Sequence, residues 1–191
     1  MVAPLEASNA DSAKGRRPMS LEFYGRVMSR PTFYSFEDFR ADVVWRVRQM
    51  EALLDSPDSD WSGVLFLDVP NKGLGISFHR LDGLDELGKN RLALRILPEL
   101  IRKTGARRFC WLMPTWHEDV EPRQEFLFLV FGEPGRRGAL FAEIRRRAAG
   151  PPTLGRWRGA EGRDKPVSIS GLFVDSLMAA VEEAKRDARA A

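Results

Sequence analysis

The residues best suited to chemistry lie in one polar segment between two apolar runs. The segment from His117 to Glu125 contains one of the two histidines of the chain, followed directly by Glu118 and Asp119. A histidine beside carboxylates can act as a general base or bind a metal, because its ordinary pKa lies near neutrality. Adjacent side chains of an extended chain point to opposite sides, however, so this run does not form a constellation by itself. His117 and Glu118 are therefore weak catalytic candidates, with a solvated turn as the alternative.

A second polar group interrupts the apolar segment between Gly63 and His79. Asp68 is the only charged residue within the run GVLFLDV, and burial of an unpaired charge is costly. If Asn71 and Lys72 form the loop of a hairpin, Asp68 shares a face with Ser77 and His79, at roughly 13 Å from the histidine. A half-solvated polar face explains these residues equally well. Asp68 is the third weak catalytic candidate.

The strongest charge signal lies between residues 136 and 158, where seven arginines accompany the single Glu143. Clustered positive charge binds phosphates, and an interleaved tryptophan can stack on a base. The alternatives are a solvated face or a surface for an acidic partner, since arginines on any surface place their stems over apolar neighbours. The segment from 35 to 60 has the opposite balance, with seven acidic residues and three arginines. The candidate binding residues of the basic segment are Arg145, Arg146, Arg156, Trp157 and Arg158.

Trp116 is a further candidate for partner binding, because it ends an apolar run beside a Pro-Thr step and an exposed ring at a rim can anchor a ligand. The single cysteine, Cys110, excludes an intramolecular disulfide and is expected to be a buried, inert thiol. No phosphate-loop, nucleophile-elbow or zinc-binding pattern occurs in the sequence. We therefore expect no metal site and no cofactor.

Apolar periodicity and turn residues predict the elements that position these residues. A capping box of Ser35 and Asp38 starts a helix, and a second helix from 82 to 104 should kink at Pro98 or break there into two helices. A third helix is expected over 137–149, and a last helix capped by Asp175. The predicted strands are 63–69, 74–79, 109–116 and 126–131, with an edge strand over 153–159 and a short strand over 167–173.

The runs 109–116 and 126–131 are apolar on both faces, and such strands are covered on both faces. The order of hairpins and helices predicts an α+β domain, or a mixed α/β one. We expect one mainly antiparallel sheet with a doubly buried central hairpin and helices on both faces. Residues 1–18 are expected to form a flexible N-terminal arm, and residues 19–191 a single globular domain.

No apolar run approaches the length of a membrane span and no signal peptide is visible, so we expect a cytoplasmic protein without membrane contact. The leading hypothesis is a non-catalytic interaction or regulatory protein, with an unknown protein partner or self-association. One alternative is a nucleic-acid-binding protein that uses residues 136–158. The other is a small hydrolase-type enzyme with its site at the loop 114–125, although the sequence favours a protein without catalysis.

Overall fold

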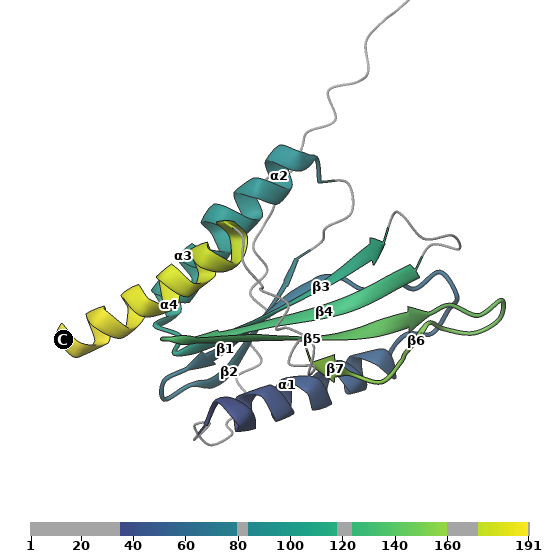
Figure 1. The fold of residues 1–191 in the computed structure, drawn as a ribbon, viewed down its shortest axis with the longest axis horizontal. Coiled ribbons are helices and arrows are strands. Elements are labelled where there is room, and N and C mark those ends of the chain that lie inside the picture. Colours follow the sequence, from purple (N-terminus) through teal and green to yellow (C-terminus); the bar gives the residue numbers. More distant parts are fainter. Residues whose placement is uncertain (1–34, 80–83, 118–123, 160–171, 191) are drawn as a thin grey trace, which may run out of the picture.

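The computed structural model describes residues 35–79, 84–117, 124–159 and 172–190. Their centre is an antiparallel sheet in the order β2-β1-β3-β4-β5-β6, with β7 also paired to β5. Figure 1 shows α1 on one face of this sheet and α2, α3 and α4 on the other. The sheet is curled, and its long central strands are β3, β4 and β5. Sequence-adjacent hairpins build most of it, since only the β1–β3 pairing joins strands separated by helices.

The helices are α1 (Phe36–Glu51), α2 (Glu86–Arg91), the π-helical segment η1 (Leu92–Ile96), α3 (Leu97–Thr104) and α4 (Leu172–Ala190). The strands are β1 (Gly63–Val69), β2 (Gly73–His79), β3 (Arg108–His117), β4 (Gln124–Glu133), β5 (Arg136–Arg145), β6 (Thr153–Leu154) and β7 (Arg158–Gly159).

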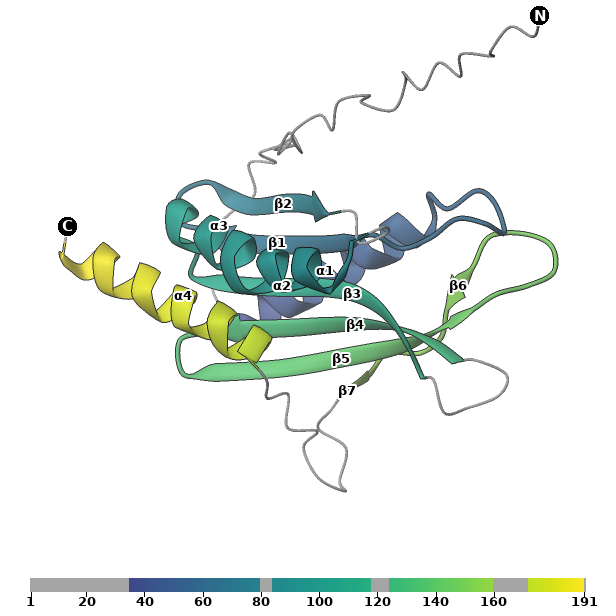
Figure 2. The ribbon, with the colours of Figure 1, turned by 90° about the horizontal axis from the view of Figure 1, so that it is seen from above.

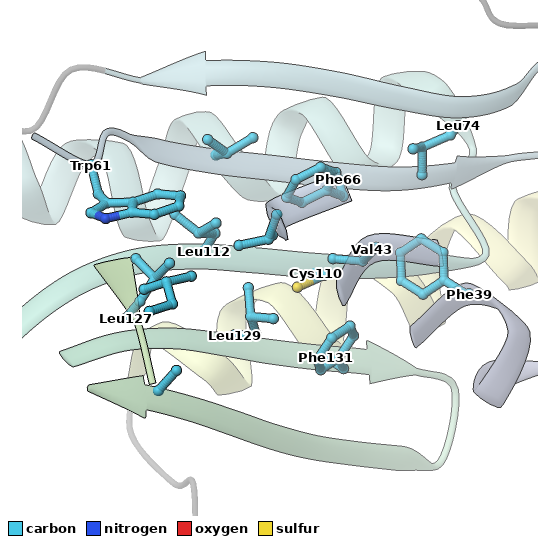
Figure 3. Close-up of a cluster of buried hydrophobic side chains, with 14 of the residues drawn as sticks. Phe39, Val43, Trp61, Phe66, Leu74, Cys110, Leu112, Leu127, Leu129 and Phe131 are labelled. Atoms are coloured by element: carbon cyan, nitrogen blue, oxygen red, sulfur yellow. The ribbon is translucent and has the colours of Figure 1, made fainter. Parts of the chain in front are cut away.

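Two hydrophobic cores lie on opposite faces of the sheet. The first packs α1 against the sheet and includes Phe39, Phe66, Cys110 and Phe131, all fully buried (Figure 3). The second lies under α3 and α4 and includes Leu67, Phe109, Trp111 and Leu177. Alternate residues of β3 enter alternate cores, as the two-sided apolar pattern predicts. The predicted fold class is therefore confirmed: an α+β domain with one antiparallel sheet, helices on both faces, and a central hairpin that is buried on both faces over residues 109–112 and 129–132.

The helix predicted from Ser35 is also confirmed. The Ser35 side chain accepts the backbone N–H of Asp38 at 3.0 Å, and the Asp38 carboxylate accepts the backbone N–H of Ser35 at 3.1 Å. This reciprocal capping satisfies two groups that a helix N-terminus otherwise leaves without partners.

The predicted register of the β1–β2 hairpin is wrong by one residue. Val69 pairs with Gly73, and not with Leu74, because the loop comprises three residues, Pro70 to Lys72. Asn71 and Gly73 both have positive φ, which lets the chain turn in this longer loop. A slip of one residue moves every side chain of a strand to the other face. Leu74 and Ile76 consequently join the α1 core, while Ser77 and His79 face the helices on the other side.

The helix predicted over 137–149 is wrong, because Arg136–Arg145 forms strand β5. The apolar residues at 140, 141 and 144 satisfy a helical stripe, yet they also fit a strand with apolar residues on both faces. The turn Pro134-Gly135, with Gly135 at a φ of 80°, joins Glu133 directly to Arg136 in a two-residue hairpin. This turn brings the following residues alongside β4, whose backbone groups need partners, and the tertiary pairing overrides the helical pattern.

Pro98 does not break its helix, which is continuous from Glu86 to Thr104 but not uniformly α-helical. The segment η1 directly precedes α3, where the backbone N–H of Leu97 donates to the carbonyl of Leu92. Such π-helical turns accommodate a local interruption of the α-helical pattern. The helix begins after the cap Asp85, whose side chain accepts the N–H of Gly88.

The remaining predictions fall partly outside the described residues. The edge strand predicted over 153–159 consists of two short strands, β6 and β7. The final helix begins at Leu172, so Asp175 lies in its first turn and does not cap it, and Phe173 is helical. Residues 167–171 and the predicted arm over 1–18 lie outside the described part of the chain.

Candidate functional site

The arginines of the basic segment are largely engaged in ion pairs within the chain. Arg136 pairs with Glu37 of α1, Arg137 with Asp175 of α4, and Arg145 with Glu143. The hydrogen bond from Arg136 is the main reason that the pKa of Glu37 lies below its ordinary value. Arg136 also lies over the ring of Phe36, 4.3 Å from its centroid. The acidic and basic segments seen in the sequence thus contact each other.

Arg146 is the most extensively bound member of this set. Its guanidinium pairs with Asp60 and with Glu125, the latter at 2.8 Å. It also approaches the backbone carbonyls of Pro57 and Ser59. Hydrogen bonds to the two carboxylates raise its pKa further above the ordinary arginine value. Arg146 therefore joins β4, β5 and the connection after α1, and it is not free to bind phosphate.

Three arginines of the segment, Arg147, Arg156 and Arg158, are exposed and form no ion pair with a described residue. Trp157 lies between two of them but packs against the α1 core, with the Arg48 guanidinium 5.7 Å from its ring centroid. Arg48 also donates to the carbonyls of Leu154 and Gly155. Trp157 is thus positioned for packing, and not for stacking on a base.

Asp68 is fully buried and is bound by two arginines, Arg108 of β3 and Arg107, which directly precedes this strand. Its carboxylate receives Arg108 Nη1 at 2.7 Å and Arg107 Nη2 at 3.4 Å. Arg108 in turn binds Glu133 at 2.8 Å. The expected face shared with Ser77 and His79 is wrong, because the corrected register places Asp68 on the α1 side of the sheet. This geometry assigns Asp68 a structural role, because its carboxylate joins the end of β1 to the two arginines at the start of β3.

Ser77 and His79 instead form a buried pair on the opposite face. Ser77 Oγ lies 3.0 Å from His79 Nε2, and the imidazole packs beside Trp111 with centroids 5.7 Å apart. Burial lowers the pKa of His79 to about 4. A base of that pKa is a weak proton acceptor near neutrality. No described carboxylate binds the imidazole, so the pair lacks the orienting third group of a nucleophilic site.

Trp116 and His117 are the last residues of β3, and their backbones pair with Glu125 and Gln124. Their side chains and the whole of Glu118 lie outside the described part of the chain. Within the described ranges, no cluster of three or more potential ligands could hold a metal ion. Cys110 is fully buried, and burial raises the pKa of its thiol well above the ordinary value.

A feature that sequence reasoning missed is a group of aromatic rings outside both cores. Phe126 and Phe128 of β4 and Phe141 of β5 point to the same side of the sheet as Trp111. The rings of Phe128 and Phe141 stack at 5.7 Å with planes 22° apart, and Phe126 meets Phe141 edge-on at 6.2 Å. All three are partly exposed, and neither core formed by described residues includes them. We refer to these three residues, together with Met113, which is partly exposed and packs against the core under α3 and α4, as the aromatic patch.

The arrangement of the helices explains why the aromatic patch is open among the described residues. Phe173 at the start of α4 contacts Trp111, and Met178 lies against Gly132, so α4 runs toward the β4–β5 turn and away from the patch. Figure 2 shows the opposite end of β3, β4 and β5 extending beyond α2, α3 and α4. Arg158 lies directly opposite Phe141 in the β5–β7 register, at the rim of the patch. Its guanidinium forms no ion pair with a described carboxylate.

The aromatic residues of this patch are visible in the sequence, but the sequence does not show that they lie together on a partly exposed surface. The period-two run Phe126, Phe128, Val130 predicts a strand, and its apolar character predicts burial along the whole length. The helical interpretation of 137–149 separates Phe141 from Phe128, so that their contact is not foreseen. Phe141 completes the patch because the β4–β5 hairpin places it opposite Phe128. The sequence signal for this hairpin is the turn Pro134-Gly135.

Comparisons with protein-family models, with curated proteins and with solved structures found no match to this chain. None of the helices in the described ranges is long and apolar enough to cross a membrane.

Proposed function

We propose that this chain is a non-catalytic interaction protein that binds a protein segment at the aromatic patch. The observation that carries the proposal is the position of Phe126, Phe128 and Phe141, which contact one another outside both cores on a part of the sheet without a described helix. Partly exposed aromatic rings grouped on a rigid sheet are typical anchors for a partner. The compartment expected for this activity is the cytoplasm.

The charge at the rim indicates the chemistry of the partner. Arg158 is exposed beside Phe141, while Glu143 on the same face is paired with Arg145. The unpaired charge of the described rim is therefore positive. A segment with aromatic or aliphatic side chains and a neighbouring carboxylate complements this surface, because the apolar side chains cover the rings and the carboxylate meets Arg158.

Nucleic-acid binding through residues 136–158 is a weaker proposal, because the ion pairs leave only three arginines of the segment without a described carboxylate partner. Three phosphate contacts correspond to a slope of log affinity against log salt of about −2 to −3. We expect affinity for nucleic acid no better than about 10⁻⁵ M at physiological salt, which is in the non-specific range. An enzymatic role has less support, since neither Asp68 nor the Ser77–His79 pair has the surroundings of a catalytic group.

A peptide selection tests the proposed function and needs no candidate partner. Displayed random peptides are selected on the full chain and counter-selected on Phe126→Ser, and the enriched peptides are then titrated in solution. We expect enrichment of apolar residues with Asp or Glu, and at least about tenfold weaker binding to Phe126→Ser and to Arg158→Glu.

The matched control is Leu94→Ser on η1, which removes an exposed apolar side chain that is not part of the patch and should bind as the wild type does. Thermal melts establish that each variant is folded. Peptides that bind Phe126→Ser and the wild type equally would refute the patch as the binding surface. Submicromolar binding of a single-stranded oligonucleotide at physiological salt, lost in Arg156→Ala with Arg158→Ala, would establish the nucleic-acid alternative instead.

A further inference from the structure

Strand β2 is an edge of the sheet that carries none of the usual sequence features that prevent pairing. Its sequence, GLGISFH, contains no Lys, Arg, Asp, Glu or Pro over seven residues. Native edge strands are ordinarily protected by charges, proline, bulges or a covering element. Among the described residues β2 pairs with β1 alone, and Figure 2 shows it at the margin of the sheet.

The opposite margin of the same sheet shows the protection that β2 lacks. The outer edge of β5 is paired with β6 at one end and with β7 beside it. The strand also carries Arg136, Arg137, Glu143 and Arg145. Among the described residues, this contrast within one sheet leaves β2 as the edge that is open to strand addition.

The side chains of β2 are compatible with a second copy of the same strand. Leu74, Ile76 and Phe78 point to the α1 side, and Phe78 is 51% exposed although it is a large apolar residue. Gly75 and Ser77 point to the other side and are small. In an antiparallel pair about a two-fold axis, apolar residues meet apolar ones and small residues meet small ones, and no like charges oppose each other between Gly73 and Phe78.

We propose that β2 pairs antiparallel with β2 of a second copy, so that the two sheets become continuous. This surface is distinct from the aromatic patch, which lies on β3, β4 and β5. The seven residues of the strand span about 24 Å. Pairing along so short an edge buries less than the ~800 Å² per partner of a standard interface. The dimer is accordingly weak and depends on concentration.

Sedimentation velocity of the full chain from about 5 to about 500 µM tests this dimer. The wild type should move from monomer toward dimer, and Phe78→Lys should remain monomeric because it places like charges at the paired edge. The matched control, Leu87→Lys, changes a residue of α2 that is 77% exposed and should associate as the wild type does.

Hydrogen exchange at both ends of this concentration range locates the interface. Amides of β2 should gain protection at high concentration in the wild type and in Leu87→Lys, but not in Phe78→Lys. A wild type that stays monomeric throughout the range overturns the proposal. Dimerisation of Phe78→Lys equal to that of the wild type, or a dimer without added protection in β2, overturns it as well.

Discussion

At the scale of single residues, the polar groups that interrupt apolar strands are explained by their immediate partners. Asp68 is fully buried but receives Arg108 and Arg107, and Arg108 is itself shared with Glu133. His79 is buried with Ser77 as its hydrogen-bond partner. Polar residues that are unusual in a sequence can therefore be structural, and they indicate chemistry only where a ligand could reach them.

Replacement of Asp68 by asparagine should destabilise the protein strongly. The variant leaves the arginines without their buried carboxylate, and breaking a buried pair typically costs about 3 kcal/mol or more. Chemical denaturation measures the free energy of unfolding, and Asp58→Asn, at an exposed position, is the control. A change below about 0.5 kcal/mol, as for an ordinary surface substitution, would contradict the structural role of Asp68.

The buried His79 should make stability depend on pH between about 6.5 and about 4. Its folded pKa of about 4 lies below the ordinary value of 6.5, so in this window the unfolded chain takes up a proton that the folded chain does not. Stability is therefore full above pH 6.5 and falls as the pH is lowered toward 4, by about 2–3 kcal/mol. Denaturation of the wild type and His79→Gln across this range isolates the contribution. An unchanged difference between the two proteins at every pH would contradict the buried, neutral imidazole.

At the scale of elements, the packing of α4 depends on the absence of a side chain at Gly132. A Cβ there would overlap the ring of Phe109 and lie 2.6 Å from Met178 Sδ. Phe109 is fully buried and cannot move aside without disturbing the core under α3 and α4. The close approach of α4 to β4 therefore requires glycine at this position.

Gly132→Ala should destabilise the protein by about 1–3 kcal/mol, the usual cost of overpacking a core. Gly138→Ala on β5 is the matched control, because an added Cβ meets nothing within 4 Å there. Thermal and chemical unfolding of both variants make the comparison. Equal stability of Gly132→Ala and Gly138→Ala would show that Phe109 and Met178 do not pack this closely against Gly132.

The elements also show what local patterns can predict and where they fail. The capping box at Ser35 and the two-sided hairpin 109–131 predicted α1, β3 and β4, because capping and burial are encoded within a few residues. The predictions for β5 and for the β1–β2 register failed, since apolar residues at 140, 141 and 144 fit two periods and the loop after Val69 admits two lengths. In both cases the pairing with a neighbouring strand decided the outcome.

At the scale of the whole molecule, the charge pattern contributes to folding, and the surface that we propose for binding is a separate, apolar one. Ion pairs from Arg136 and Arg146 to Glu37 and Asp60 join the basic segment to the acidic one. This pairing is not visible in the sequence, where the two segments suggest docking to other molecules. The candidate site moves from the arginines to the aromatic patch, which only the assembled hairpins create.

The central claim is that the aromatic patch is open in the complete chain, and hydroxyl-radical footprinting of the full-length protein tests it most directly. Phe126, Phe128 and Phe141 are compared with Phe66 and Phe131, which are fully buried in the α1 core. Oxidation requires that the radical reach the ring, so the patch phenylalanines should react several times faster than the core pair. Patch rings that react as slowly as Phe66 and Phe131 would show that the surface is covered, and would contradict the proposed function.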